Sequence, residues 1–178
     1  MEAEDLLKRP EPTRPYERVA AQLTLPAGGL KATLAMLQRA GKRESGLIWY
    51  GPRAENGDGV VKLVVAPRQR MTWGNYHIPA EAVAMVVRRL PDDWRPLAQV
   101  HSHPGIWVEH STYDDRMALS RRALSVVFPH YGHYSAPTFP LGVGVHEFQS
   151  NYWHLLPSDV VAGRILISDG AVQAADLR

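Results

Sequence analysis

The chain has 178 residues, of which 45% are hydrophobic and 21% charged, a balance typical of one soluble globular domain. Twenty basic and eighteen acidic side chains leave a net charge of +2, and no Lys or Arg run is long enough to suggest a nucleic-acid partner. The absence of cysteine excludes disulfides and a thiol nucleophile. No apolar run approaches the roughly 18 residues of a membrane span, and the acidic start is unlike a signal peptide, so we expect a cytoplasmic protein without a membrane partner.

The first part of the chain predicts an arm, a strand and a helix. Residues 1–17 are charged and carry prolines at positions 10, 12 and 15, which predicts a flexible N-terminal arm. Residues 19–25 alternate enough to predict a strand. Leu30, Leu34 and Leu37 then form the apolar stripe of a helix, which Gly41 ends.

The next segment predicts a hairpin followed by an irregular loop. Residues 44–50 are predicted as a strand, the turn chemistry at 54–59 indicates a hairpin, and residues 60–66, apolar on both faces, are predicted as a central return strand. The loop at 67–79 contains Trp73 and Tyr76. Large side chains in a loop are either tucked beneath it or exposed as a binding rim.

The rest of the chain alternates short strands with helices. A helix is predicted from Pro79 to Leu90, and residues 160–167 are predicted as either a last strand or a short closing helix. A second aromatic loop, at 129–140, contains Tyr131 and Tyr134. The remaining predicted strands are 96–100, 124–128, 141–147 and 152–156. This order indicates an α+β or mixed α/β fold, a mainly antiparallel sheet flanked by helices.

Two histidines follow the predicted strand at 96–100. Side chains of a strand alternate faces, so His101 and His103 point the same way. Ser111 and Asp114 form a Ser-x-x-Asp helix start, which puts Asp114 in the first helical turn. Two histidines and a carboxylate, with a fourth position left to water, are the ligand set of a catalytic zinc. Each feature alone is more often structural: a strand histidine usually lies in the core, and Ser-x-x-Asp is usually only a cap.

Taken together, the pattern His-x-His-Pro-x6-Ser-x2-Asp resembles the signature of the JAMM zinc metalloproteases, also called the MPN+ or JAB family, and every position matches. With the order of the elements, the resemblance covers about residues 18–167. It implies a cytidine-deaminase-like MPN/JAB fold in one domain at 18–168, followed by a C-terminal tail at 169–178. It also implies a Zn2+ ion held by His101, His103 and Asp114.

The family carries a glutamate just ahead of an apolar strand that ends in glycine, and Glu44 with Gly51 matches this spacing. A carboxylate in front of such a strand is costly unless it lies at an edge or a site. The resemblance implies that Glu44 is the general base for a zinc-activated water and that the Ser111 hydroxyl donates to the developing oxyanion. The chain departs from many members in having Leu47 where they have glycine, with Gly46 one place earlier.

Bacterial members resemble deubiquitinases, which implies hydrolysis after the C-terminal glycine of a ubiquitin-like protein, with activating or conjugating enzymes as further partners. The two aromatic loops fall where the family inserts its substrate-binding segments. We therefore expect four aromatic residues to line the substrate groove, namely Trp73, Tyr76, Tyr131 and Tyr134.

Other functions remain open. Within the enzymes, the chain could trim a sulfur-carrier protein, act as a general metallopeptidase or hydrolyse a small-molecule amide. Outside them, relatives of this fold serve as metal-free scaffolds, although these typically lose one or more ligands. Three other histidines, His110 between the expected ligands and His130 and His133 in the second aromatic loop, are interpreted as loop or rim side chains and not as ligands.

Overall fold

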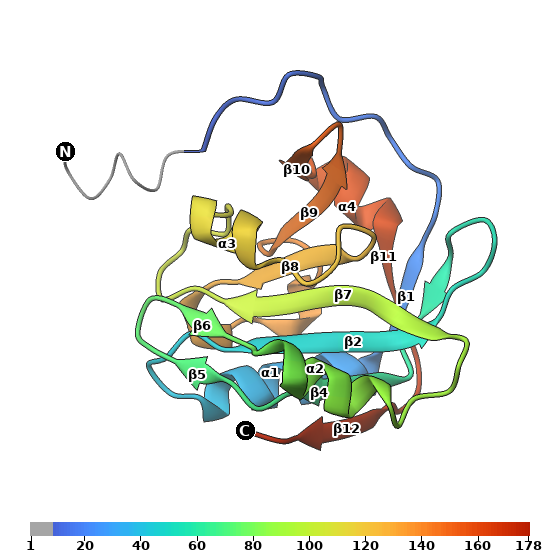
Figure 1. Cartoon of the computed structure of the whole chain (residues 1–178). Helices are drawn as coiled ribbons and strands as arrows, with labels where there is room; N and C mark the ends of the chain where they lie inside the picture. The colour runs from blue at the N-terminus through green and yellow to red at the C-terminus, as the bar shows by residue number, and fades with distance from the viewer. Residues whose placement is uncertain (1–8) are drawn as a thin grey trace.

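The computed structural model describes residues 9–178 (Figure 1). The helices and strands in chain order are β1 (Leu23–Pro26), α1 (Ala27–Arg39), β2 (Gly46–Pro52), β3 (Gly59–Val60), β4 (Leu63–Ala66), β5 (Arg70–Met71), β6 (Tyr76–His77), α2 (Ala80–Val87), β7 (Trp94–Ser102), α3 (Thr112–Met117), β8 (Leu124–Phe128), η1 (His130–Gly132), η2 (Ala136–Thr138), β9 (Gly144–Gln149), β10 (Tyr152–Leu155), α4 (Ser158–Arg164), β11 (Ile165–Ser168) and β12 (Gln173–Asp176). No helix within residues 9–178 has both the length and the hydrophobicity needed to cross a bilayer.

A seven-stranded mixed sheet, in the order β10-β9-β8-β7-β2-β4-β12, forms the centre of the molecule. Its pairings are antiparallel except for β7 with β8 and β4 with β12. Two small sheets accompany it, the parallel β11-β1-β3 and the hairpin β5-β6. The predicted fold class, a mainly antiparallel sheet with flanking helices, is confirmed.

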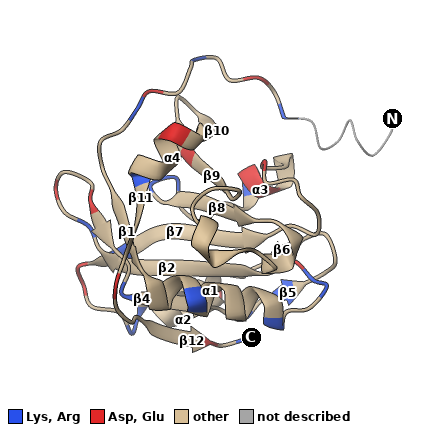
Figure 2. Cartoon of the chain, turned by 180° about the vertical axis from the view of Figure 1, so that it is seen from behind, with Lys and Arg blue, Asp and Glu red and all other residues tan. Residues whose placement is uncertain are grey.

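The strand β2 shows how the two faces of the sheet are covered. Leu47 and Trp49 belong to the large core beneath α1, whereas Ile48 and Tyr50 pack with Val86 of α2. Because side chains alternate along a strand, α1 and α2 each pack against every second residue of β2. Figures 1 and 2 show α1 and α2 on opposite faces of the sheet, and Figure 2 shows that most charged residues lie outside its strands.

Several predicted segments differ from the structure in their bounds. The first strand begins at Leu23 and not at residue 19, and the predicted strand 60–66 is divided between two sheets, as β3 and β4. The last segment holds both predicted alternatives in succession, the helix α4 and then the strand β11. The interpretation of 169–178 as a tail is wrong for its central part, because β12 pairs in parallel with β4 and covers an otherwise open sheet edge.

The described part of the N-terminal arm has no helix or strand, but it is attached to the domain. Arg9 donates to Asp115 Oδ2 at 2.7 Å and to the carbonyl of Trp153 at 2.6 Å. The Tyr16 hydroxyl donates to Glu147 Oε2 at 2.6 Å. Residues 9–17 therefore lie along the body of the protein, whereas residues 1–8 of the predicted arm lie outside the described residues.

The chain has glycine at position 46 and leucine at position 47 at the start of β2, and the packing around Gly46 explains this order. A methyl group added there would lie 2.2 Å from Cε2 of Tyr76, so the ring of Tyr76 occupies the space that a side chain would need. We expect Gly46→Ala to lower the free energy of unfolding by about 1–3 kcal/mol, as overpacked cores do, measured by chemical denaturation. Gly74→Ala is the matched control, because nothing lies within 4 Å of its added methyl. Equal losses in both variants would contradict a clash with Tyr76.

Candidate metal centre

Two of the three expected metal ligands are held at the end of β7. His101 lies in β7 between β2 and β8, paired with Gly46 on one side and Val127 on the other, and it is 1% exposed. His103 follows the strand, where its backbone N–H donates to Phe128 O at 2.9 Å. Hydrogen bonds to neighbouring strands thus fix the backbone that carries both imidazoles.

The third ligand lies in the first turn of α3, as the Ser-x-x-Asp pattern predicts. Asp114 Oδ2 accepts hydrogen bonds from the backbone N–H and the hydroxyl of Ser111, at 2.7 and 2.8 Å. In return, Ser111 Oγ accepts from the backbone N–H of Asp114 at 3.2 Å. This reciprocal capping box fixes the orientation of the Asp114 carboxylate.

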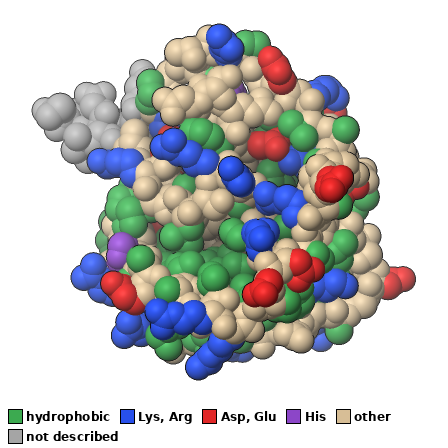
Figure 3. Space-filling view, turned by 45° about the vertical axis from the view of Figure 1, so that its right-hand side comes forward, with side chains coloured by type: hydrophobic (Ala, Val, Ile, Leu, Met, Phe, Trp, Pro, Cys, Tyr) green, Lys and Arg blue, Asp and Glu red, His purple; other side chains and the backbone are tan. Residues whose placement is uncertain are grey.

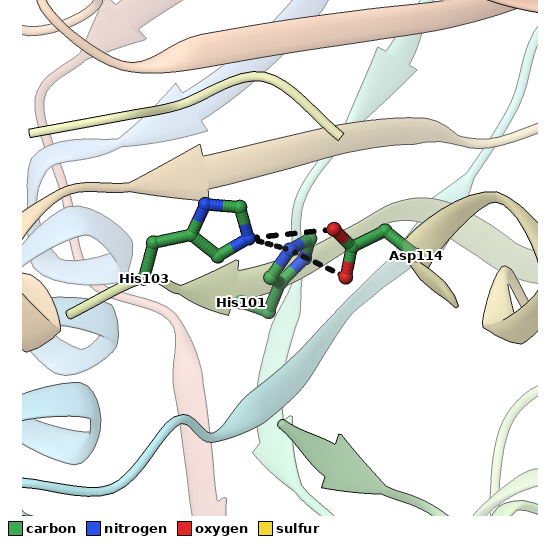
Figure 4. Close-up of side chains that lie close together, drawn as sticks. All are labelled: His101, His103 and Asp114. Atoms are coloured by element: carbon green, nitrogen blue, oxygen red, sulfur yellow. Dashed lines mark hydrogen bonds and ion pairs between the residues drawn. The ribbon is translucent and has the colours of Figure 1, made fainter. Parts of the chain in front are cut away.

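The three side chains converge on one point (Figure 4). The Nε2 atoms of His101 and His103 are 3.1 Å apart, and Asp114 Oδ1 and Oδ2 lie 3.3 and 3.4 Å from His101 Nε2 and His103 Nε2. Zinc–nitrogen and zinc–oxygen bonds of about 2.0–2.1 Å place tetrahedral ligand atoms about 3.4 Å apart. The two histidine–carboxylate separations, each to a different oxygen of Asp114, are close to this value, and the Nε2–Nε2 separation is slightly shorter. Small side-chain adjustments would therefore let the cluster hold a metal ion of that size.

The second ring nitrogen of His103 supports its role as a ligand. His103 Nδ1 lies 3.0 Å from the carbonyl oxygen of Trp107, which can only accept a hydrogen bond. In the neutral ring the proton therefore lies on Nδ1, and the lone pair of Nε2 faces the cluster. His101 Nδ1 is buried and has no hydrogen-bond partner among residues 9–178.

The ionisation of the cluster is that of a cation site. Burial acts to raise the pKa of Asp114, but the adjacent His101 and His103 outweigh it and hold the pKa well below its usual range. Burial lowers the pKa of His101, which favours the neutral, coordinating imidazole. Burial would also lower the pKa of His103, but the adjacent Asp114 outweighs it and raises that pKa. An ionised carboxylate thus lies between the two imidazoles in a largely buried place.

Glu44 lies beside the cluster and outside it. The residue lies two positions before β2, its backbone N–H donates to Thr72 O at 2.8 Å, and it is only 5% exposed. Burial, with a smaller contribution from Asp114, raises the pKa of Glu44 to about 7, while His103 opposes the shift. The side chain lines the same pocket as His103 and Asp114, where a carboxyl group with such a pKa can both take and return a proton near neutral pH.

This pocket, the zinc-site pocket below, has a volume of about 300 Å³. Its walls come from the loop before β6 and from the motif region, and they include Ser111. The residues that line it are Glu44, Gly74, Asn75, His103, Pro104, Gly105, Trp107, Ser111, Tyr113 and Asp114. Trp107 and Tyr113 were not among the residues expected from sequence. Both occupy positions that the motif leaves free, so only their location between the ligands could have indicated them.

Of the four aromatic residues expected at the substrate groove, Trp73 and Tyr131 contact each other, whereas Tyr76 and Tyr134 pack against other rings of the protein. Trp73 is 74% exposed, and its carbonyl accepts a 2.8 Å hydrogen bond from the Tyr131 hydroxyl, so the two aromatic loops meet. Tyr76 is 4% exposed, with its ring 5.3 Å from that of His101, so its assignment to the groove is wrong. Tyr134 packs against Phe128 instead of lining the zinc-site pocket.

His110 is buried, which corrects its interpretation as a loop or rim side chain. Its Nδ1 lies 2.9 Å from Asp115 Oδ1, its Nε2 lies 2.7 Å from Ser125 Oγ, and its ring stacks on that of His146 at 3.9 Å between centroids. The side chain therefore ties α3 to β8 and β9. His130 and His133 are exposed, as expected for loop residues.

We expect His110→Ala to lower the free energy of unfolding by about 1–3 kcal/mol, because it leaves the buried Ser125 hydroxyl without its partner. Urea denaturation measures this loss. His133→Ala is the control, since an exposed loop side chain should change stability by less than about 0.5 kcal/mol. The folded His110→Ala variant should keep its metal, and loss of the metal would show that His110 belongs to the ligand set.

Comparison with known proteins agrees with this geometry. The family described as prokaryotic homologs of the JAB domain matches residues 26–138, a stretch that contains Glu44 and all three candidate ligands. The solution structure of protein DSY2949 from Desulfitobacterium hafniense is similar with a TM-score of 0.57 and 16% identity, over 84% of this chain and 95% of that one. At this identity the likeness concerns the fold alone. No curated protein matches the chain.

Proposed function

The chain belongs to the family of prokaryotic homologs of the JAB domain, and from this we propose that it is a zinc-dependent peptidase or isopeptidase. The bond to be hydrolysed is the one after the C-terminal glycine of a ubiquitin-like protein. The proposal depends on one observation above all. Three donor side chains have ligand atoms within 4.8 Å of one another, and two of them, His103 and Asp114, line one pocket with the buried carboxyl group of Glu44.

Three residues would hold the metal: His101, His103 and Asp114. A bound zinc ion supplies a Lewis acid, which polarises a scissile carbonyl and makes a water molecule acidic at neutral pH. All positions of the signature are filled in this chain, and the donor atoms lie at suitable distances. Both observations favour a metal site over the metal-free scaffold.

The chain's own residues would move the proton. We propose that the Glu44 carboxylate takes a proton from the attacking water and delivers it to the departing amine. A pKa of about 7 suits both halves of this exchange. Removing such a proton-transfer group typically costs about 10²–10⁴-fold in rate.

Ser111 would act on the oxygen of the scissile carbonyl. Its hydroxyl lines the zinc-site pocket and donates to Asp114 Oδ2 in the present structure. To serve as an oxyanion donor, the hydroxyl must turn away from Asp114. The backbone N–H of Ser111 would then still hold Asp114 Oδ2 at 2.7 Å, so the ligand would keep its orientation.

The shape of the site supports a substrate with a slender end. The zinc-site pocket has a volume of only about 300 Å³, and its walls include Asn75, Pro104 and Gly105. Trp107, which lines the pocket, is 72% exposed, and Trp73, which precedes the pocket residue Gly74, is 74% exposed. An extended tail ending in glycine would pass close to the metal, and the folded body of a ubiquitin-like protein would rest on the exposed aromatic side chains.

A defined fusion tests this function. Ubiquitin-like proteins ending in glycine, each fused to a short C-terminal peptide, are incubated with the purified protein, and the products are identified by mass spectrometry. We expect a single cut directly after the glycine. A zinc chelator should stop it, and so should replacement of the glycine by leucine. Scattered cuts in unfolded proteins, unaffected by the glycine replacement, would contradict deconjugation and indicate a general peptidase.

A further inference from the structure

A second hollow, the arginine cleft, lies at the opposite end of β7 from the metal ligands. It has a volume of about 380 Å³ and is bounded by the 53–59 loop, the turn before β8 and parts of β1 and β9. Basic side chains gather in the middle of the corresponding face of the molecule (Figure 3). The arginines that line the cleft are Arg53, Arg121, Arg122 and Arg164.

An adjoining hollow of about 310 Å³ extends the cleft. The two hollows share Arg53, Glu55 and Arg122, and the second adds Arg95. Arg53 and Arg122 therefore stand where the two spaces meet. A ligand that occupied both would be elongated, with its most strongly charged part at this junction.

Four of these arginines lack a counter-charge. Within the part of the chain that the structure describes, no carboxylate lies within 4.0 Å of the guanidinium groups of Arg53, Arg95, Arg121 or Arg122. Of the two carboxylates that line the cleft, Glu147 is bound by Arg164 Nη2 at 2.7 Å and by the Tyr16 hydroxyl. The other, Glu55, is exposed on the loop. The cleft thus carries a clear excess of positive charge.

The pKa of Arg53 reflects how close these positive charges lie to one another. Burial lowers the pKa of Arg53, and the nearby Arg122 and Arg164 lower it further. Arg164 itself is only 7% exposed, and its Nε has no hydrogen-bond partner among residues 9–178. Like charges held together in this way destabilise the protein unless an anion neutralises them.

The cleft also has an apolar floor. Leu23, Leu97, Leu124 and Phe148 line it, and the Arg121 guanidinium lies 4.7 Å from the centroid of the Phe148 ring. The three leucines are only 3–5% exposed, so a ligand would reach mainly the half-buried Phe148 and Val19, which is 37% exposed. A bare inorganic anion would leave this apolar surface unused. The combination suits a molecule that carries an anionic group and a flat apolar group.

We propose that the arginine cleft binds a phosphorylated small molecule with an aromatic ring, of which a nucleotide is the simplest kind. Guanidinium groups bind phosphate through paired hydrogen bonds, and Arg122 can supply such a pair. Arg53 Nη2 donates to the carbonyl of Pro96 and Arg95 Nη1 to those of Asp92 and Trp94, so these two arginines would contribute their remaining N–H groups. The ring lies on the apolar floor beside Phe148. The volume falls within the range of about 300–1,000 Å³ that is usual for small-molecule sites. The site is separate from the zinc-site pocket, so its occupancy does not depend on the proposed peptidase activity.

Isothermal titration of the full chain tests the proposal, with ATP as the ligand and inorganic triphosphate and hexaglutamate as comparisons. We expect saturable binding of ATP, and at least about tenfold weaker binding in Arg53→Gln/Arg122→Gln, because two charge-assisted contacts are lost. Arg89→Gln is the matched control, an exposed arginine on the turn after α2, and should change the affinity by less than about twofold.

The single variant Arg122→Gln separates a loss of ATP binding from a loss of folding. Arg53 donates to the carbonyl of Pro96, so its replacement can disturb the loop, whereas the Arg122 side chain is exposed. Arg122→Gln alone should therefore keep the wild-type melting temperature and still weaken ATP. No saturable binding of ATP, or equal losses in Arg89→Gln, would overturn the proposal. If inorganic triphosphate bound as tightly as ATP, the aromatic ring would not contribute to binding and that part of the proposal would be wrong. If hexaglutamate bound as tightly as ATP, the cleft would be assigned to an acidic peptide instead.

Discussion

Glu44→Gln is expected to lower kcat by about 10²–10⁴-fold on a glycine-ended fusion substrate while the protein keeps its zinc. The substitution preserves the size of the side chain but removes its ability to accept a proton. Glu44 is not in the cluster of convergent donor atoms, so the metal should stay bound. Single-turnover kinetics and elemental analysis of the same preparation measure the two effects together.

The control for this experiment is Glu55→Gln, which removes a carboxylate from an exposed loop at the other end of the molecule. Its rate should match that of the wild type. If Glu44→Gln lost its zinc along with its activity, Glu44 would be a ligand and not a proton carrier. If it kept full activity, another group would have to move the proton.

His103→Ala is expected to lose the metal. Wild-type protein should contain about one zinc ion per chain and the variant close to none, because two protein donors bind zinc far more weakly than three. A bound metal also stabilises the folded state. A chelator should therefore lower the melting temperature of the wild type and leave that of the variant unchanged. Elemental analysis and thermal denaturation, with and without chelator, provide the two measurements.

His133→Ala supplies the comparison for the metal, since this exposed histidine lies in the loop after η1 and outside the cluster. It should retain its zinc and respond to the chelator as the wild type does. Equal zinc in His103→Ala and the wild type would remove His103 from the ligand set. The proposed hydrolysis would then need another metal site or none.

The sequence by itself determined the candidate metal centre, because local rules govern each of its parts. Alternation along one strand places His101 and His103 on the same face, and the Ser-x-x-Asp capping box orients Asp114 through hydrogen bonds only three residues apart. The class of the sheet followed from the order of the elements. Such patterns span a few neighbouring residues, so they can be recognised without knowing how the chain folds back on itself.

The tertiary structure alone decided which side chains surround that centre. Tyr76 is covered because Gly46, 30 positions earlier in the sequence, leaves room for its ring, and His110 is buried because β8 and β9 supply Ser125 and His146. Neither an irregular segment nor the two-residue strand β6, which contains Tyr76, has a periodicity that would separate buried from exposed aromatic residues. The edge strand β12 and the arginine cleft could not be predicted for the same reason. Each brings together segments that are distant in the sequence, and their proximity depends on packing and not on a local pattern.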